Sequence, residues 1–360
     1  MESFNNYIVN LSNLKFNFKQ IKSCIGPNVK VCAMVKADAY GHGLKDVCKA
    51  LYGADFFGVA NVVEAKQIRK FNKFAPILIV GVVNVLALDW CAKNNVSVIV
   101  SSLNELKSFI DVLGGKSINI HIKINTGLNR VGVKTIKEFK QMLKLFKSNK
   151  NLVFEGVFTH FATKQNNIEF LLKQHSKFNE FVNCVKLSNV IVHAANSFAT
   201  LMFSSCHHSM VRCGFNLYGW QTDALKGFKP VLNITSKLVF IHHIKKGDAV
   251  GYDCTFVAPK DMVVGVVPVG YADGFDRRLS NNFKVLINGV WATVIGNVCM
   301  DVFMVDLTNV ECCVGDEVVL MGKSGNFELT PNHYAKALGT SPYEILLKFR
   351  YNRMNRVLIK

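Results

Sequence analysis

The stretch VCAMVKADAYGHG, residues 31–43, begins as a run of apolar residues and then turns polar and rich in glycine. Its first five residues are typical of a buried β-strand, and Lys36 stands where that strand ends. Similar runs recur between residues 30 and 220, with helical stretches between them. The eight runs are VCAMV (31–35), FFGVAN (56–61), PILIVG (76–81), VSVIVS (96–101), INIHIKI (118–124), FEGVFTH (154–160), VIVHAA (190–195) and SMVRCGF (209–215). Eight βα repeats predict an α/β fold, a (β/α)8 barrel of the TIM type.

The pattern changes near Pro230. Beyond it helical periodicity fades, and strand-like runs follow one another with Gly and Asn turns. These runs are MVVGVVPVGYADG (262–274), KVLINGVWATVIGNVCMDVFMVDL (284–307) and DEVVLMG (316–322). We therefore expect a barrel over residues 1–230 and a mostly β C-terminal domain over residues 231–360. One helical stretch, PNHYAKALG (331–339), is expected to cover part of the second domain's sheet.

Composition narrows the class of protein. The 360 residues are 50% hydrophobic, and the net charge is +18. The lysines are spread along helical stretches such as residues 134–150, and no nucleic-acid-binding motif accompanies them, so no nucleic-acid partner is expected. We expect no membrane span or cleaved leader, and a cytoplasmic location. Eleven cysteines without any C-x-x-C predict neither a disulfide framework nor a metal site, and the pairs His207–His208 and His242–His243 are expected at the surface.

Polar side chains follow several of the predicted barrel strands. In such barrels the reactive groups lie on the loops after the carboxyl ends of the strands. We expect the following residues to converge on one mouth of the barrel: Lys36, residues 125–130, His160, Asn196 with Ser197, and residues 212–215. A low-dielectric site lowers the pKa of a buried lysine and makes its amine a nucleophile toward an aldehyde. For Lys36 alone, an ion pair with a carboxylate such as Asp38 is the alternative.

The segment around Lys36 resembles the cofactor-lysine signature of the alanine racemases, which use pyridoxal 5'-phosphate. The resemblance runs nearly end to end. Its further motifs are FGVANVVEA (57–65), HIKINTGLNRVG (121–132), GVFTHFAT (156–163), HAANS (193–197), MVRCGFNLYG (210–219), VGYDCTF (250–256), PVGYADGFDRRL (268–279) and NVCMD (297–301). The resemblance implies interconversion of L- and D-alanine, which would supply D-alanine for peptidoglycan.

Racemisation requires that a proton leave one face of Cα and return to the other, so two bases must flank it. The resemblance implies that these bases are Lys36 and Tyr252. A phenol with a pKa of about 10 is a poor base unless cations stabilise its anion, which His160 and nearby arginines could do. In the resembling enzymes this tyrosine reaches the lysine of a neighbouring subunit, which implies a homodimer with shared active sites. Without its motif, Tyr252 would be taken for an ordinary core tyrosine.

The resemblance also implies the cofactor contacts. Arg212 would donate to the pyridine nitrogen and, because arginine keeps its proton, would leave that nitrogen an acceptor. A structural ion pair is the alternative for Arg212. The cofactor and its phosphate would be held by Tyr40, His160, Asn196, Ser197, Gly214, Phe215 and Tyr343. Asn196 and Ser197 could equally form a helix cap.

Substrate contacts come from the same resemblance. Arg130 would steer the cofactor's phenolic oxygen and the substrate carboxylate, and Met300 would add backbone to the substrate pocket. A polar access path would be formed by Tyr271, Arg277 and Asp301. Lys123 matches a lysine that is carbamylated in many relatives, where the added negative charge would hold Arg130.

Four positions depart from the usual pattern, and they leave the electrostatics of the access path open. They are Asn125, Leu128, Asn297 and Val302, where aspartate, methionine, arginine and glutamine are common. Competing functions are a racemase of broader specificity that accepts serine or other small amino acids, a decarboxylase of the same architecture, and a non-catalytic cofactor-handling protein. The decarboxylases lack the VGYDCTF tyrosine segment, and a cofactor-handling protein would be a lone barrel.

Overall fold

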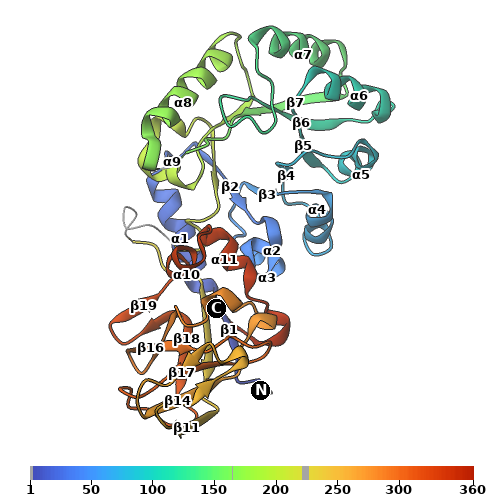
Figure 1. The fold of residues 1–360 in the computed structure, drawn as a ribbon. Helices are drawn as coiled ribbons and strands as arrows, with labels where there is room; N and C mark the ends of the chain where they lie inside the picture. Colours follow the sequence, from blue (N-terminus) through green and yellow to red (C-terminus); the bar gives the residue numbers. More distant parts are fainter. Residues whose placement is uncertain (1–2, 164, 221–226) are drawn as a thin grey trace. The chain divides into compact units, whose positions relative to one another are not determined.

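The computed structural model describes residues 3–163, 165–220 and 227–360. The chain folds into two compact units, a barrel unit and a β-rich unit (Figure 1). The barrel unit consists of Leu14–Ala39 and Gly43–Phe228. The β-rich unit consists of Met1–Asn13, Tyr40–His42 and Lys229–Lys360.

Eight parallel strands form the sheet of the barrel unit, in the order β8-β7-β6-β5-β4-β3-β2-β9. Their bounds are β2 Lys30–Met34, β3 Phe56–Val59, β4 Ile77–Ile79, β5 Val96–Val100, β6 Ile118–Lys123, β7 Leu152–Phe158, β8 Ile191–His193 and β9 Met210–Cys213. The amide of Ser209 donates to the carbonyl of Val192 at 3.0 Å, so β9 lies beside β8 and the ring nearly closes. All eight strands predicted from the sequence are confirmed, and with them the barrel.

Helices alternate with these strands, and Figure 1 shows α4 to α8 outside the ring. Several begin at a residue whose side chain accepts from a backbone amide of the first turn: Asn61, Ser102, Thr135, Asn167 and Asn196. The helix bounds are α1 Leu11–Cys24, α3 Leu44–Ala50, α4 Val62–Arg69, α5 Leu88–Lys93, α6 Leu103–Leu113, α7 Ile136–Ser148, α8 Ile168–Asn183 and α9 Ser197–Met202. These caps fix where each loop at the barrel mouth ends.

The β-rich unit is built on a ten-stranded sheet with the order β11-β14-β17-β16-β15-β18-β10-β1-β20, and β19 pairs with β18. The bounds are β1 Asn6–Asn10, β10 Leu232–Lys237, β11 Phe240–Ile244, β14 Met262–Val267, β15 Lys284–Ile287, β16 Val290–Ile295, β17 Phe303–Asp306, β18 Glu317–Ser324, β19 Phe327–Leu329 and β20 Asn355–Ile359. A separate ribbon joins β12 Ala249–Val250 to β13 Phe256–Val257. Strand β1, which the sequence analysis did not predict, pairs antiparallel with β10 and parallel with β20.

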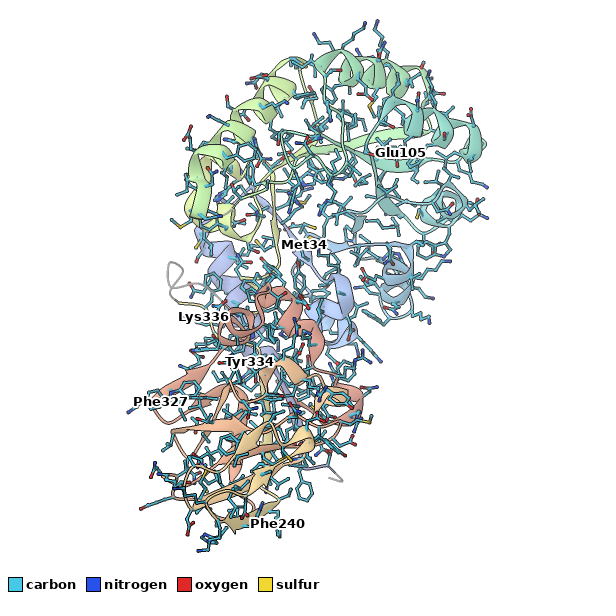
Figure 2. The ribbon with its side chains drawn as sticks, viewed as in Figure 1. Met34, Glu105, Phe240, Phe327, Tyr334 and Lys336 are labelled. Carbon is cyan, nitrogen blue, oxygen red and sulfur yellow. The ribbon has the colours of Figure 1, made fainter. Side chains whose placement is uncertain are left out.

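Two helices complete this unit, α10 Pro331–Leu338 and α11 Pro342–Lys348. The first is the predicted helix. Its Tyr334, labelled in Figure 2, is buried and donates to the carbonyl of Leu320 in β18. Phe283 packs against the Tyr334 ring at a centroid distance of 4.4 Å, so α10 is anchored to the sheet by aromatic contacts. Across the described ranges, no helix is both long and apolar enough to traverse a bilayer.

Candidate active site

Lys36 follows β2 and opens a turn of left-handed backbone, α2 Lys36–Tyr40. Ala37, Asp38, Ala39 and Tyr40 have φ angles of 52–55°. Left-handed backbone costs a non-glycine residue about 1–2 kcal/mol. The whole turn therefore stores about 4–8 kcal/mol of strain, which the surrounding structure must offset to keep the backbone of Lys36 where it is.

Two carboxylates hold this turn. The Ala37 amide donates to Oε1 of Glu64 at 2.7 Å, and the Ala60 amide donates to Oε2 of the same carboxylate at 2.7 Å. At the other end, the Leu44 amide donates to Oδ1 of Asp38, also at 2.7 Å. Glu64 was not singled out from the sequence. Its place three residues after the capping Asn61 is a signal that could have indicated it.

Cationic side chains gather at the carboxyl ends of the barrel strands. Burial lowers the pKa of Lys36, and the charge of Arg130 lowers it further, while Glu64 raises it. Burial, followed by Arg130 and Arg212, lowers the pKa of Lys123 to about 8. His160 has a pKa well below its usual value because of burial and of these same cations. Because each of these pKa values responds to the charges of the others, these five basic side chains lie near one another in the barrel unit.

Arg212 lies on β9 and is 4% exposed. Nη1 contacts Nδ1 of His193 at 2.8 Å and its carbonyl oxygen at 3.1 Å. Nη2 donates to the carbonyls of Thr159 at 2.6 Å and Ala194 at 3.0 Å, and lies 3.4 Å from Nδ1 of His160. Within the described part of the chain no carboxylate pairs with Arg212, so the structural ion pair considered as an alternative is wrong. Burial lowers its pKa to about 10, which keeps the guanidinium charged at neutral pH.

The residues after β8 and β9 contact one another. Asn196 caps α9, because its Oδ1 accepts from the Ala199 amide at 3.0 Å. The hydroxyl of Ser197 accepts from the amide of Gly214 at 3.0 Å. Phe215 is buried directly after Gly214. The structure thus confirms that Asn196 is the N-cap of α9. The Ser197 hydroxyl links the loop after β8 to the loop after β9.

Other polar groups, three of them buried and one half-buried (Glu155), lie beneath the mouth and were not singled out from the sequence. They are His193 on β8, His121 on β6, Glu155 on β7 and Ser97 on β5, linked by hydrogen bonds. His207 was expected at the surface, but it is 7% exposed and its Nε2 donates to the carbonyl of Thr200 at 2.7 Å. A cluster of three or more His, Cys, Asp or Glu side chains able to hold a metal ion is absent from the described ranges.

In the β-rich unit, Tyr252 opens a short 3-10 turn, Tyr252–Cys254, and is 69% exposed. Asn297 fixes this turn, since its Nδ2 donates to the Tyr252 carbonyl at 3.0 Å and to Oδ2 of Asp253 at 3.1 Å. Arg277 pairs with the same carboxylate at 3.3 Å. Tyr252 is thus not a core tyrosine of this chain. A surface hollow of about 470 Å³ beside it is lined by His242, Ile244, Ala249, Val250, Gly251, Tyr252, Cys299 and Met304.

The loops that carry Tyr271 and Met300 lie in close backbone contact. The Tyr271 amide donates to the carbonyl of Cys299 at 3.1 Å, and a Cβ added at Gly270 would lie 2.1 Å from the carbonyl oxygen of Met300. Only glycine permits this approach. Tyr271 and Met300 are 44% and 53% exposed, and Asp301 pairs with Arg353.

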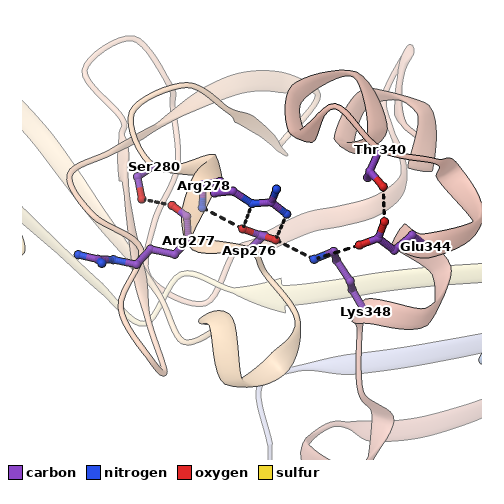
Figure 3. A network of polar contacts seen from close by, with 7 residues as sticks. All are labelled: Asp276, Arg277, Arg278, Ser280, Thr340, Glu344 and Lys348. Carbon is purple, nitrogen blue, oxygen red and sulfur yellow. Dashed lines mark hydrogen bonds and ion pairs between the residues drawn. The ribbon is translucent and has the colours of Figure 1, made fainter.

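Asp276 connects the loop that carries Arg277 to helix α11 (Figure 3). It binds Arg278 through both carboxylate oxygens, at 3.0 and 2.8 Å, and Nζ of Lys348 at 2.7 Å. The side-chain hydrogen bonds from Arg278 and Lys348 hold its pKa far below its usual value. Asp276 was not singled out from the sequence, although it stands within the PVGYADGFDRRL motif.

Tyr343 on α11 faces Tyr40 at a ring-centroid distance of 6.0 Å. Burial raises the pKa of Tyr343 to about 12, so its hydroxyl stays protonated and can donate. Gly41, next to Tyr40, has a φ of 85°, and a Cβ there would lie 2.7 Å from the carbonyl oxygen of Leu346 on the same helix. The glycine-rich end of the 31–43 segment thus allows the backbone to approach α11.

Comparison with known proteins agrees with this arrangement. The family model described as "Alanine racemase, N-terminal domain" matches residues 9–222, and "Alanine racemase, C-terminal domain" matches residues 231–358. "Alanine racemase 2" of Caldanaerobacter subterraneus subsp. tengcongensis is 34% identical over 354 residues, which cover 94% of this chain and 90% of that protein.

Solved structures agree as well. The crystal structure of alanine racemase from E. faecalis has a TM-score of 0.93 at 31% identity and covers 99% of this chain and 98% of its own. Alanine racemase from Bacillus anthracis with bound L-Ala-P has a TM-score of 0.92 at 31% identity, with coverages of 100% and 96%. The two family models together span nearly the whole sequence. The chain therefore belongs to the alanine racemase family of isomerases.

Proposed function

We propose that this racemase interconverts L- and D-alanine with pyridoxal 5'-phosphate held at Lys36 and with two bases, Lys36 and Tyr252. The observation that carries the proposal is the lowered pKa of Lys36, an amine at the carboxyl end of a barrel strand among other cations. Lowering the pKa increases the share of neutral amine, which is the form that reacts with an aldehyde.

The residues fit this cofactor chemically. The mouth of the barrel holds Lys36, Lys123, Arg130 and Arg212, and each of the two lysines has its pKa lowered by other cations of this set. A phosphate and a substrate carboxylate would relieve this repulsion. When bound, pyridoxal 5'-phosphate supplies an aldehyde that links to amines and a ring that draws electrons from the Cα–H bond.

Each base has a defined task in the proposal. Nζ of Lys36 takes or returns the proton on one face of Cα, and Oη of Tyr252 does so on the other. We propose that Tyr252 comes from a second copy of the chain, so that residues 231–360 complete the site of the partner's barrel, residues 1–230. The 69% exposure of Tyr252 supports this, because an exposed side chain is available to a second copy. The arginines would stabilise the tyrosine anion by their charge, whereas His160, which its lowered pKa leaves neutral, would offer a hydrogen bond and no charge.

The cofactor contacts follow from the donors available. The Nε–H of Arg212, which none of its hydrogen bonds described above uses, is the donor that we assign to the ring nitrogen. We assign the phosphate to the hydroxyls of Tyr40, Ser197 and Tyr343 and the amides near Gly214 and Phe215, with Asn196 supporting Ser197. The protonated hydroxyl of Tyr343 supports that choice.

Arg130 is proposed to bind the substrate carboxylate, and Met300 to border the substrate. Tyr271, Arg277 and Asp301 would then line the approach. We also propose that Lys123 is carbamylated. Its pKa of about 8 leaves a sizeable share of neutral amine at neutral pH, and a carbamate anion there would be attracted by Arg130 and Arg212.

The cellular role proposed is supply of D-alanine for peptidoglycan in the cytoplasm. The test is incubation of purified protein and pyridoxal 5'-phosphate with L-alanine, followed by chiral analysis, with Lys36→Ala as the matched control. Formation of D-alanine by the native protein but not by Lys36→Ala supports the proposal, and equal product from both refutes it. Parallel incubation with L-serine tests the alternative of broader specificity.

A further inference from the structure

A line of hydrogen bonds runs from Arg212 to β7; it is buried between Arg212 and His121 and part-buried at its Glu155 end. Nη1 of Arg212 lies 2.8 Å from Nδ1 of His193, and Nε2 of His193 lies 2.8 Å from Nδ1 of His121. Nε2 of His121 lies 2.8 Å from Oε2 of Glu155, which also accepts from the hydroxyl of Ser97. We call these five residues the histidine relay.

Only one arrangement of protons satisfies the histidine relay. Arginine can only donate, so Nδ1 of His193 must accept, and a neutral imidazole then carries its proton on Nε2. That proton is donated to Nδ1 of His121, whose own proton must therefore sit on Nε2 and point at Glu155. An ionised carboxylate only accepts, so Glu155 fixes the far end. Burial and the charge of Arg212 hold the pKa of His193 well below its usual value, which keeps it neutral.

The surrounding side chains hold both imidazoles in place. Phe158 stacks on His193 with a centroid distance of 4.8 Å and an interplanar angle of 7°. Phe56 meets His121 edge-on at 6.4 Å. A Cβ added at Gly156, the neighbour of Glu155, would lie 2.2 Å from Nδ1 of His121, so β7 carries glycine where this ring needs room. Because both imidazole rings are packed in fixed orientations, the direction in which the hydrogen bonds of the relay are donated depends on which nitrogen of each ring carries the proton.

We propose that Glu155 is a positioning residue for the reaction: through His121 and His193 it ensures that Arg212 always meets an acceptor, which fixes the guanidinium. This rests on the proposed role of Arg212 as donor to the cofactor's ring nitrogen. If the relay were reversed, Nδ1 of His193 would carry a proton and two N–H donors, His193 Nδ1 and Arg212 Nη1, would face each other. Their repulsion would displace the Arg212 guanidinium.

Among the described residues, three groups act on the Glu155 carboxyl: His121 from β6 and Ser97 from β5 through hydrogen bonds, and Lys30 from β2 through its charge. Burial by itself would raise the pKa of this carboxyl. The hydrogen bonds from His121 and Ser97 and the charge of Lys30 outweigh burial, so the pKa lies below its usual value. Glu155 therefore stays ionised at neutral pH and keeps accepting from Nε2 of His121, and acid that protonates it removes this constraint on the direction of the relay.

The test is 15N NMR of histidine-labelled holoenzyme, which reports the protonated nitrogen of each imidazole, combined with steady-state kinetics. Native protein should show both His121 and His193 protonated on Nε2. Glu155→Leu should lose this pattern and lower kcat by roughly 10- to 100-fold, with KM changed far less. Glu155→Gln keeps an acceptor oxygen and should retain the tautomers and most of kcat. Glu169→Gln, an exposed carboxylate on α8, is the control and should change nothing.

The proposal is overturned if Glu155→Leu keeps both tautomers and its kcat, or if Glu155→Gln is as impaired as Glu155→Leu. Should Glu155→Leu not fold, Ser97→Ala gives the same test by a smaller change. Loss of that hydroxyl raises the pKa of Glu155, so acid should disturb the tautomers at a higher pH than in native protein, and an unchanged pH of this disturbance refutes the proposal. Failure of the proposed function would instead appear as native protein without cofactor binding or racemisation, whereas the NMR pattern reports on the relay in either case.

Discussion

The substitution Glu64→Gln tests how the turn after Lys36 is maintained. In the native protein the carboxylate accepts from the amides of Ala37 and Ala60, each at 2.7 Å. Glutamine offers only one acceptor oxygen and places an N–H group opposite the second amide. Hydrogen bonds to a charged group contribute about 1.5–3 kcal/mol each, and neutral ones about 1 kcal/mol. Loss of one bond and weakening of the other should therefore cost about 2–4 kcal/mol.

That loss is about half of the strain stored in the left-handed turn, so the turn should open locally more often. The assay is hydrogen–deuterium exchange of peptides that cover residues 36–44, read by mass spectrometry. A cost of 2–4 kcal/mol corresponds to a fall in protection of about 30- to 900-fold. Because the charge of Glu64 raises the pKa of Lys36, the substitution should also make the Lys36 amine reactive at lower pH.

The matched control is Glu169→Gln, which removes an exposed carboxylate paired with Lys173 and should leave exchange at residues 36–44 unchanged. If Glu64→Gln keeps protection there within about threefold of native, a difference below 1 kcal/mol, then the carboxylate does not hold the turn and the reasoning is wrong.

Three further predictions concern the other groups of the site. The pKa of Asp276 is lower in the folded protein than in the unfolded chain, so its ion pairs with Arg278 and Lys348 stabilise the fold fully above about pH 4 and progressively less at lower pH. Asp276→Asn should therefore lower the free energy of unfolding, measured in urea, by about 1–2 kcal/mol at pH 7 and by less at pH 3. An equal loss at both pH values would contradict this prediction. Tyr252→Phe should still bind cofactor but lose roughly 10²–10⁴-fold in turnover. If subunits share active sites, mixing this variant with Lys36→Ala should restore about a quarter of native activity, because half of the dimers are mixed and each mixed dimer has one intact site. No recovery of activity after verified subunit exchange would refute shared sites. Intact mass should show a carboxyl group added to Lys123 more at pH 8 than at pH 6, since more of the amine is neutral near its pKa of about 8; an unmodified amine at ample carbon dioxide would refute carbamylation.

The regular parts of the barrel were predictable because local rules and tertiary structure agree there. Most of the strands are short apolar runs, and polar residues follow some of them closely, as Lys36 two residues after β2 and His160 two residues after β7 illustrate. The capping residues Ser102 and Thr135 each stand three residues before a glutamate, a pattern that marks a helix start in the sequence.

The left-handed turn was not predictable, since alanine, aspartate and tyrosine rarely adopt that backbone on their own. It persists through Glu64, which lies 27 residues along the chain from Ala37. The histidine relay was missed for a similar reason. His121 and Glu155 are 34 residues apart and meet only because β6 and β7 pair with a register shift at Ile120 and His121. Sequence periodicity places residues on a face but not opposite one another.

His207 shows where a local rule failed. The adjacent pair His207–His208 was predicted to lie at the surface, yet His207 is buried and its Nε2 donates to the backbone carbonyl of Thr200. Strand β1 was missed as well, because its partners β10 and β20 lie more than 200 residues further along the chain. Both errors concern contacts that only the folded chain creates.

The most direct test of the central claim is reduction of the holoenzyme with borohydride, followed by peptide mapping. A pyridoxal group bound to a lysine becomes permanently attached on reduction, so the modified residue can be read from the fragment masses. Attachment at Lys36, with Lys123 unmodified by the cofactor, is the predicted result. Recovery of native Lys36 with no cofactor attached, or attachment at another lysine, would contradict the account.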